Sequence, residues 1–333
     1  MKGRLMRWAA VGAMLAGLAL MTLLVAHFGI AEVGHAIAAA GWTCVIAISG
    51  IHLLLVGVMG LAWWLLARHR SGRGTAWTFI WGRLLRDAGS ELLPLSQVGG
   101  YVLGVRAVTL RGVGTAIAAA SMVVDVTLEL GGQIFFTALG VALLVHLRPA
   151  STMTTPLLIG LGAAAVAAAL FIVVQQRKVH LLDRLAERLA QGWIVAVAVG
   201  AEAVQREIRA IYRDGAGVLG CFTLHTATWL ASALEAWIAL HLMGAGLAIG
   251  PVLAIESLLY AARSAAFLVP NALGIQEGAY IVLGAAFGLP PEMALALSLL
   301  KRARDLVLGV PALLTWQFTE GRRLLARRSI APP

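Results

Sequence analysis

Long apolar stretches alternate with short polar connections along almost the whole chain. Six of these stretches have the length of a membrane-spanning helix, which needs about 20 apolar residues. They cover residues 8–28, 42–66, 113–145, 156–175, 216–242 and 292–318. We predict that all six are transmembrane helices, and that residues 1–333 form a single transmembrane domain of an all-α polytopic membrane protein.

The composition excludes a soluble globular protein. Of the 333 residues, 60% are hydrophobic and only 13% are charged, and the mean hydropathy is +0.87; such values are typical of membrane proteins. The two cysteines, Cys44 and Cys221, lie far apart in apolar runs, so we expect neither a disulfide framework nor a CxxC metal site. His225 and His241 lack metal-ligand spacing and are expected to pack in the core, so no metal is predicted.

The first apolar stretch has a second interpretation. Ala38, Ala39 and Ala40 resemble a signal-peptidase site downstream of residues 8–28. The apolar run is longer than the roughly 7–15 residue core of a signal peptide. An uncleaved first helix, followed by an outer loop that ends at residue 41, is therefore predicted.

The distribution of basic residues predicts the orientation. Nineteen of the 26 Lys and Arg lie before the first stretch, after the last one, or within residues 68–73, 106–111 and 177–213. All of these segments are expected on one side of the membrane. The connections 31–41 and 243–250 contain no Lys or Arg, and Arg148 is the one basic residue expected outside. Because basic residues of short connections stay in the cytoplasm, both termini are predicted to be cytoplasmic.

Two regions are too irregular for a single span. Residues 75–110 are interrupted at Pro94, and residues 251–288 are interrupted at Pro270 and Gly274. We predict two re-entrant helical hairpins, the first from the cytoplasmic side and the second from the opposite side. Lipid cannot satisfy irregular backbone, so both hairpin tips should line an interior cavity.

The two hairpin regions are similar to each other. Arg86, Leu92-Leu93-Pro94, Gln97 and Asp125 are followed 176 to 180 residues later by Arg263, Leu268-Val269-Pro270, Gln276 and Asp305. The halves 42–145 and 216–318 start on opposite sides of the membrane, so they form inverted repeats, which are typical of transporters. The alternative is an old duplication that only builds a stable bundle.

The remaining segments connect or extend the repeats. Residues 1–41 hold the first helix and its outer loop, and residues 319–333 form a basic cytoplasmic tail. Residues 146–215 hold a connecting helix and a cytoplasmic segment that is either amphipathic and interfacial or a solvated connector.

Fourteen Lys, Arg, Asp and Glu side chains fall inside the predicted membrane segments, away from the segment ends. At about 2.5–3.5 kcal/mol each, they would cost far more than the roughly 5–15 kcal/mol that stabilises a folded protein. Most must therefore be paired or hydrated. They are Arg83, Arg86, Arg263, Lys301, Arg302, Arg304, Asp87, Glu91, Asp125, Glu129, Glu235, Glu256, Glu277 and Asp305.

Three carboxylates are candidates for gating or proton coupling. Asp125 and Glu129 are four residues apart and so share one helix face, while Asp305 lies in the cationic strip 301–305 of the last span. We expect this strip to face the acidic pair from the other repeat. Purely structural ion pairing is the alternative.

A second group of residues fits a polar head group. Arg86 and Arg263 stand two helical turns before the hairpin prolines, and Ser96 and Asn271 are suitable N-caps for the second half-helices. Guanidinium groups beside helix N-termini suit a lipid phosphate or carboxylate; alternatively, they cap carbonyls of the broken helices. The predicted head-group residues are Arg83, Arg86, Ser96, Gln97, Arg263, Asn271, Gln276, Glu277 and Arg304, and the hairpin-break residues are Pro94, Gly99, Gly100, Pro270, Gly274 and Gly278.

With Arg86, Leu92-Leu93-Pro94, Gly99-Gly100-Tyr101, the stretch Gly274 to Gly278 and Arg304-Asp305 in view, the sequence resembles the flippase-like transmembrane domain of lysylphosphatidylglycerol synthases. More narrowly, it resembles stand-alone bacterial members associated with hopanoid biosynthesis, the HpnL branch. The resemblance implies a bacterial inner-membrane protein that moves a hopanoid or a charged phospholipid between leaflets.

The same resemblance sets the remaining expectations. The aminoacyl-transferase domain of bifunctional members is expected to be missing, and no Walker A motif is present, so we expect a transporter rather than an enzyme. No cofactor and no nucleic-acid partner are expected. The expected partners are a membrane lipid and, in addition, lipid-biosynthesis enzymes or a lipid exporter; the alternative is a non-transporting accessory subunit of a lipid pathway.

Overall fold

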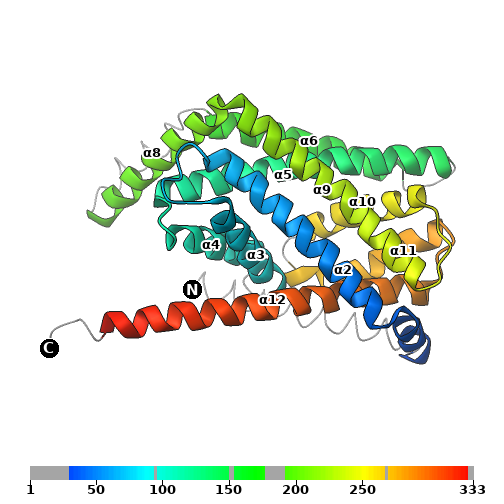
Figure 1. Ribbon diagram of the computed structural model, residues 1–333. Helices are drawn as coiled ribbons and strands as arrows, with labels where there is room; N and C mark the ends of the chain where they lie inside the picture. The colour runs from blue at the N-terminus through cyan, green and yellow to red at the C-terminus, as the bar shows by residue number, and fades with distance from the viewer. Residues whose placement is uncertain (1–29, 94–95, 150–153, 177–191, 267–268, 329–333) are drawn as a thin grey trace.

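The computed structural model describes residues 30–93, 96–149, 154–176, 192–266 and 269–328. In these residues the chain forms ten α-helices and one short 3-10 turn, with no strand (Figure 1). The helices are α2 (Ile30–Ala67), α3 (Ala76–Leu92), α4 (Ser96–Thr109), α5 (Thr115–Leu147), α6 (Thr154–Gln176), α8 (Gly192–Arg213), α9 (Gly215–Leu242), α10 (Ile249–Ala265), α11 (Ile275–Ala286) and α12 (Pro291–Arg328). The all-α prediction is confirmed for the described residues.

Four of the helices are long and apolar enough to cross a membrane. They are Gly41–Ala67 within α2, Thr115–Leu147, Thr155–Gln175 and Gly215–Leu242, and they match four of the six predicted spans. The predicted span 8–28 lies outside the described residues. The predicted span 292–318 lies in α12, which has 38 residues but carries four charged residues between positions 301 and 305, so its crossing stays a prediction.

The predicted outer loop 31–41 is wrong in part. Helix α2 begins at Ile30, and the chain leaves helical geometry at Gly41, which has φ 63° and ψ 179°. The lack of Lys and Arg in this connection predicts its side of the membrane but carries no information on its conformation. Residues 30–40 are rich in alanine, which favours helix.

The first predicted hairpin is a pair of antiparallel helices packed through glycine. Near the tip, a Cβ atom on Gly100 would lie 2.1 Å from Ser90 Oγ and 2.3 Å from the Arg86 carbonyl oxygen. Further along the hairpin, Gly82 and Gly104 face each other in the same way. The backbones of α3 and α4 therefore approach more closely than residues with side chains would allow.

The second predicted hairpin has a different break. After α10, residues Pro270–Ala272 form a 3-10 turn, and α11 then begins at Ile275. Asn271 and Ala272 have φ of 51° and 45°, a left-handed conformation that is uncommon outside glycine. Two such residues in succession mark a strained segment, and strained backbone is often found at functional sites.

The two hairpins start from opposite ends of the helix bundle. The first lies near the start of α9, where Arg68 at the end of α2 lies 3.5 Å from Asp214. The second lies near the end of α5, where the Cβ position of Gly250 is 3.8 Å from Leu147. Helix α5 runs between these ends, in agreement with the predicted opposite orientation of the two halves (Figure 1).

Separate apolar cores occupy the two ends. One core gathers residues of α2, α3, α4 and α5 around Trp63 and Phe79, whose rings meet edge to face at 5.1 Å. The other gathers residues of α2, α5, α9, α10, α11 and α12 around Leu144, Leu240 and Tyr280. Along α2 and α5, the residues between these two cores include Glu129 and line a cavity.

The glycine packing generates a prediction with an internal control. Replacing Gly100→Ala should destabilise the protein by about 1–3 kcal/mol, because the added methyl group meets backbone atoms that cannot move freely. Gly278 follows the second hairpin break as Gly99 and Gly100 follow the first, and nothing lies within 4 Å of its Cβ position. Gly278→Ala should therefore be neutral or slightly stabilising. Thermal unfolding in detergent micelles measures both, and equal stability of the Gly100→Ala variant and the wild type would contradict the packing argument.

Candidate functional site

A cavity of about 430 Å³ lies between the two apolar cores. Residues from α2, α3, α4, α5, α9, α10 and α12 line it. Both hairpin breaks reach it: Glu91 and Gln97 flank the first break, and Asn271 and Ala272 lie in the second. This arrangement agrees with the prediction that both tips line one interior cavity.

All fourteen ionisable side chains of the predicted membrane segments are paired. Each of the six cations lies within 4.0 Å of at least one carboxylate, and each of the eight carboxylates has a cationic partner. Charges that are removed from water have to be paired, and here the pairing is complete within the protein.

The first cluster attaches the hairpin arm α3 to α5. Arg83 donates to Asp87 at 2.9 Å and to Glu129 at 2.7 Å, and Arg86 donates to Asp125 at 2.9 Å and to Glu129 at 2.5 Å. Both arginine side chains are 5% exposed. Asp125 and Glu129 are thus neutralised inside their own repeat and form no ion pair with the cationic strip of α12, although Glu129 lines the same cavity as Arg304 and Asp305.

In the second cluster, the cations of α12 are paired with carboxylates. Lys301 donates to Glu256 of α10 at 2.5 Å, and Arg302 donates to Glu277 of α11 at 2.6 Å. Arg304 contacts Glu235 of α9 and donates to Asp305 at 2.7 Å. Asp125 and Asp305 thus accept from different cations and are not paired with each other.

One arginine–carboxylate pair joins the two repeats. Arg263 of α10 donates to both carboxylate oxygens of Glu91 of α3 at 2.9 Å, and to Asn271 Oδ1 at 3.3 Å. The side chains of Arg263 and Glu91 are 16% and 23% exposed, so this pair is more open than the pairs of Arg83, Arg86 and Arg304. It connects the two hairpins directly across the cavity.

The helix N-termini differ from the prediction. Asn271 is not the N-cap of α11; Gly274 occupies that position, with φ 76°, and its N–H donates to Glu277 Oε2 at 2.8 Å. Glu277 therefore already supplies the negative charge that favours a helix N-terminus, and no lipid anion is needed there. In the first hairpin, α4 begins at Ser96, whose side chain is not described, and Pro94 lies outside the described residues.

Most of the predicted site residues are brought together, and some are not. The cavity is lined by Arg83, Arg86, Gln97, Glu129, Arg263, Asn271, Arg304 and Asp305. Asp125, Gln276 and Glu277 are buried away from it, and Gln276 donates to Ser298 at 2.9 Å. A structural capping role fits Arg302 better than Arg86 or Arg263, since its guanidinium nitrogens lie 3.5 Å from the Asn271 carbonyl oxygen.

Sequence reasoning did not assign a role to several residues of the site. Asp87 and Glu91 line the cavity, and His52 Nδ1 lies 3.2 Å from Glu235 Oε2. The i,i+4 spacing of Arg83 and Asp87 was a usable signal. The pairing of Arg263 with Glu91 had no such signal, because it joins residues 172 positions apart.

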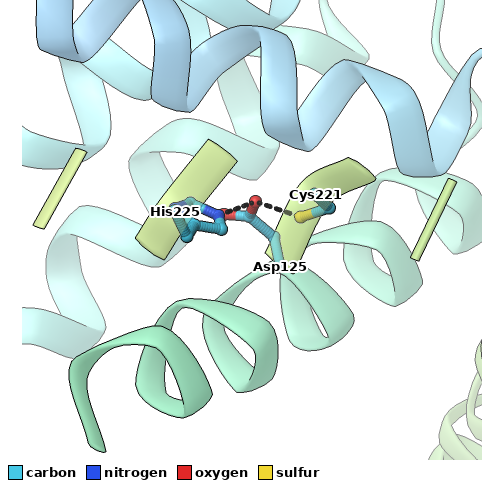
Figure 2. A group of neighbouring side chains, drawn as sticks. All are labelled: Asp125, Cys221 and His225. Carbon is cyan, nitrogen blue, oxygen red and sulfur yellow. Dashed lines mark hydrogen bonds and ion pairs between the residues drawn. The ribbon is translucent and has the colours of Figure 1, made fainter. Parts of the chain in front are cut away.

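Asp125 also has partners on α9. Its Oδ1 lies 2.8 Å from His225 Nε2 and 3.7 Å from Cys221 Sγ, and all three side chains are fully buried (Figure 2). Sequence reasoning assigned His225 to core packing. In the structure, His225 instead lies against Asp125, whose carboxylate also accepts a hydrogen bond from Arg86.

Comparisons with known proteins identify the family. The model of the lysylphosphatidylglycerol synthase transmembrane region matches residues 9–312. The chain therefore belongs to this family, and it is a membrane protein with several apolar helices. No curated protein and no solved structure matched the chain.

The buried first cluster generates a stability prediction. Arg86→Met should destabilise the protein by about 3–5 kcal/mol, because it leaves Asp125 and Glu129 with less compensation in a buried position. Arg106→Met removes an arginine from an exposed pair with Glu320 at 2.9 Å and should cost less than about 1 kcal/mol. Unfolding in detergent measures both; similar losses for the two variants would show that burial does not set the cost.

The bridge between the hairpins generates a second prediction. Single reversals, Glu91→Arg or Arg263→Glu, should destabilise the protein, whereas the double reversal should recover about 0.5–3 kcal/mol of the combined loss. The measurement is a double-mutant cycle by thermal unfolding. Strictly additive losses would mean that the two side chains are not coupled.

Proposed function

We propose that the protein is a lipid translocase that moves a lipid between the leaflets of a bacterial inner membrane. The observation that carries the proposal is the cavity between two oppositely oriented hairpins, lined by charged side chains at the interface of the halves. Inverted halves that meet at a central polar site are the arrangement with which transporters alternate access. The lipid head group would occupy the cavity while its tails remain in the bilayer.

The charged residues that line the cavity indicate which kind of lipid head group would fit. Its lining contains four arginines, Arg83, Arg86, Arg263 and Arg304, and four acids, Asp87, Glu91, Glu129 and Asp305. Because the formal charges balance, a head group with both signs fits better than a purely anionic one. A phosphate would replace a carboxylate at a guanidinium, while an ammonium group would take the released carboxylate.

Arg263 and Glu91 are the proposed first contacts for the head group. They form the most open ion pair of the cavity, and their pair connects the two repeats. A head group that inserts between them separates the hairpins and supplies new partners to both charges. Binding is thereby coupled to the movement of one half against the other.

The three predicted gating carboxylates differ in their position relative to the cavity. Glu129 and Asp305 line the cavity, whereas Asp125 is fully buried behind it. We therefore assign direct gating or proton coupling to Glu129 and Asp305. Asp125 has a positioning role, because it accepts from Arg86.

We propose two classes of lipid. A hopanoid fits the branch that the sequence resembles, and a charged phospholipid fits the balanced cavity. Partners would then be lipid-biosynthesis enzymes or a lipid exporter. The competing function is a non-transporting accessory or scaffold subunit that presents a lipid to a biosynthetic enzyme without moving it.

Reconstitution in liposomes tests the proposal. The purified wild type should exchange a fluorescent phospholipid or a hopanoid between leaflets faster than empty vesicles, as measured by outer-leaflet quenching or extraction. Arg263→Gln should slow the exchange about tenfold or more, equivalent to about 1.4 kcal/mol on the barrier. Arg263 is preferable to Arg86 for this test, because truncation of the more deeply buried Arg86 should also impair folding.

The matched control is Arg70→Gln. Arg70 pairs with Glu207 at 2.5 Å at the end of α2, is 42% exposed and lies outside the cavity, so its variant should exchange lipid at the wild-type rate. Wild-type exchange by Arg263→Gln would contradict its assignment. Specific lipid binding without exchange by the wild type would replace the translocase with the accessory-subunit function.

A further inference from the structure

Three chemically different ligand groups converge behind the cavity wall. Asp125 of α5 and Cys221 and His225 of α9 place a carboxylate oxygen, a sulfur and an imidazole nitrogen within 4.8 Å of one another (Figure 2). Each of the three side chains is 0% exposed. Cys221 and His225 are four residues apart on one helix, so they point to the same face, and Asp125 completes the group from a neighbouring helix.

The spacing fits a tetrahedral ion. With zinc–ligand distances of about 2.0–2.3 Å, the ligand atoms of a tetrahedral site lie about 3.3–3.8 Å apart. Here Asp125 Oδ1 lies 3.7 Å from Cys221 Sγ and 2.8 Å from His225 Nε2. The first distance already matches this spacing, the second would have to lengthen by about 0.5 Å, and the third ligand–ligand distance is at most 4.8 Å.

Hydrogen bonding alone leaves the group incompletely satisfied. Cys221 makes a single long contact with the carboxylate. A metal ion would engage thiolate, imidazole and carboxylate together.

The surrounding charges leave room for a cation. The cluster around Asp125 contains two cations, Arg83 and Arg86, and three carboxylates, Asp87, Asp125 and Glu129. Its formal charge is therefore −1. A divalent ion bound with the Cys221 thiolate and a neutral imidazole brings +1 and makes the cluster neutral.

A hydrogen bond from outside the three-residue group holds the Asp125 carboxylate. Arg86 donates to Asp125 Oδ2 at 2.9 Å, which leaves Oδ1 directed at the α9 side chains. Carboxylates that bind metals are commonly held by such an outer hydrogen bond.

We propose that Asp125, Cys221 and His225 bind a zinc-class divalent cation that fastens α5 to α9 next to the cavity. A mixed sulfur, nitrogen and oxygen set suits Zn²⁺ and its spectroscopic substitute Co²⁺, and excludes Mg²⁺ and Ca²⁺, which take oxygen ligands. The inference does not depend on lipid transport, and the spacing C-x₃-H alone had not indicated it.

Metal content is the first test. The full chain is purified in detergent, freed of any affinity tag, incubated with Zn²⁺, desalted and analysed by mass spectrometry for metals. We expect about one zinc ion per chain, with three protein ligands and a fourth position left for water, and a loss to background in Cys221→Ser and His225→Gln. Cys44→Ser is the matched control, because Cys44 is the other fully buried cysteine and lies in a separate apolar core, so its zinc content should equal that of the wild type.

Cobalt spectroscopy keeps the test independent of the variants. Wild-type protein loaded with Co²⁺ should show tetrahedral ligand-field bands and a thiolate-to-cobalt charge-transfer band. Background zinc in folded, loaded wild type, or equal zinc in the wild type and Cys221→Ser, would overturn the proposal. A cobalt spectrum without the thiolate band would overturn it as well, even if Cys221→Ser failed to fold.

Discussion

The need to pair every charge inside an apolar bundle determines how this protein is assembled. Six cations and eight carboxylates lie in segments that the sequence assigns to the membrane, and each has an oppositely charged partner. Removing one partner of such a pair costs more than the pair itself contributes. The pairs therefore fix which helices can be neighbours: α3 with α5, α10 and α11 with α12, and α9 with α12.

In the two repeats, the cation and the acid of the ion pair lie on opposite helices. In the first, the hairpin arm supplies the cation and the following helix the acid, as in Arg86 and Asp125. In the second, the arm supplies Glu256 and the following helix supplies Lys301. Arg263, which matches Arg86 in the repeat alignment, is consequently not needed within its own repeat. It reaches Glu91 of the other half, and this asymmetry is what produces an open ion pair at the interface.

How far the sequence predicts the structure depends on the range of each interaction. Apolar length and proline breaks predicted four of the long helices and both hairpins, because these signals are local. The count of embedded charges predicted that they must be paired. The partners were not predictable, since Arg263 and Glu91 are separated by 172 positions and the repeat alignment gives equivalent residues, not contacts. Asn271 was assigned as an N-cap from its residue type, but the left-handed turn at Asn271 and Ala272 moves the cap to Gly274.

Asp125 connects the packing of the bundle with the chemistry of the cavity. One carboxylate oxygen accepts a hydrogen bond from Arg86, whose side chain lines the cavity. The other oxygen faces His225 and Cys221 on α9. A change in what binds on the α9 side alters the charge that Arg86 experiences, because both act on the same carboxylate at less than 4 Å. The Coulomb interaction at such distances is weakly screened in a buried site. If the cavity binds a charged head group as proposed, its affinity would therefore depend on whether the proposed metal site behind it is occupied.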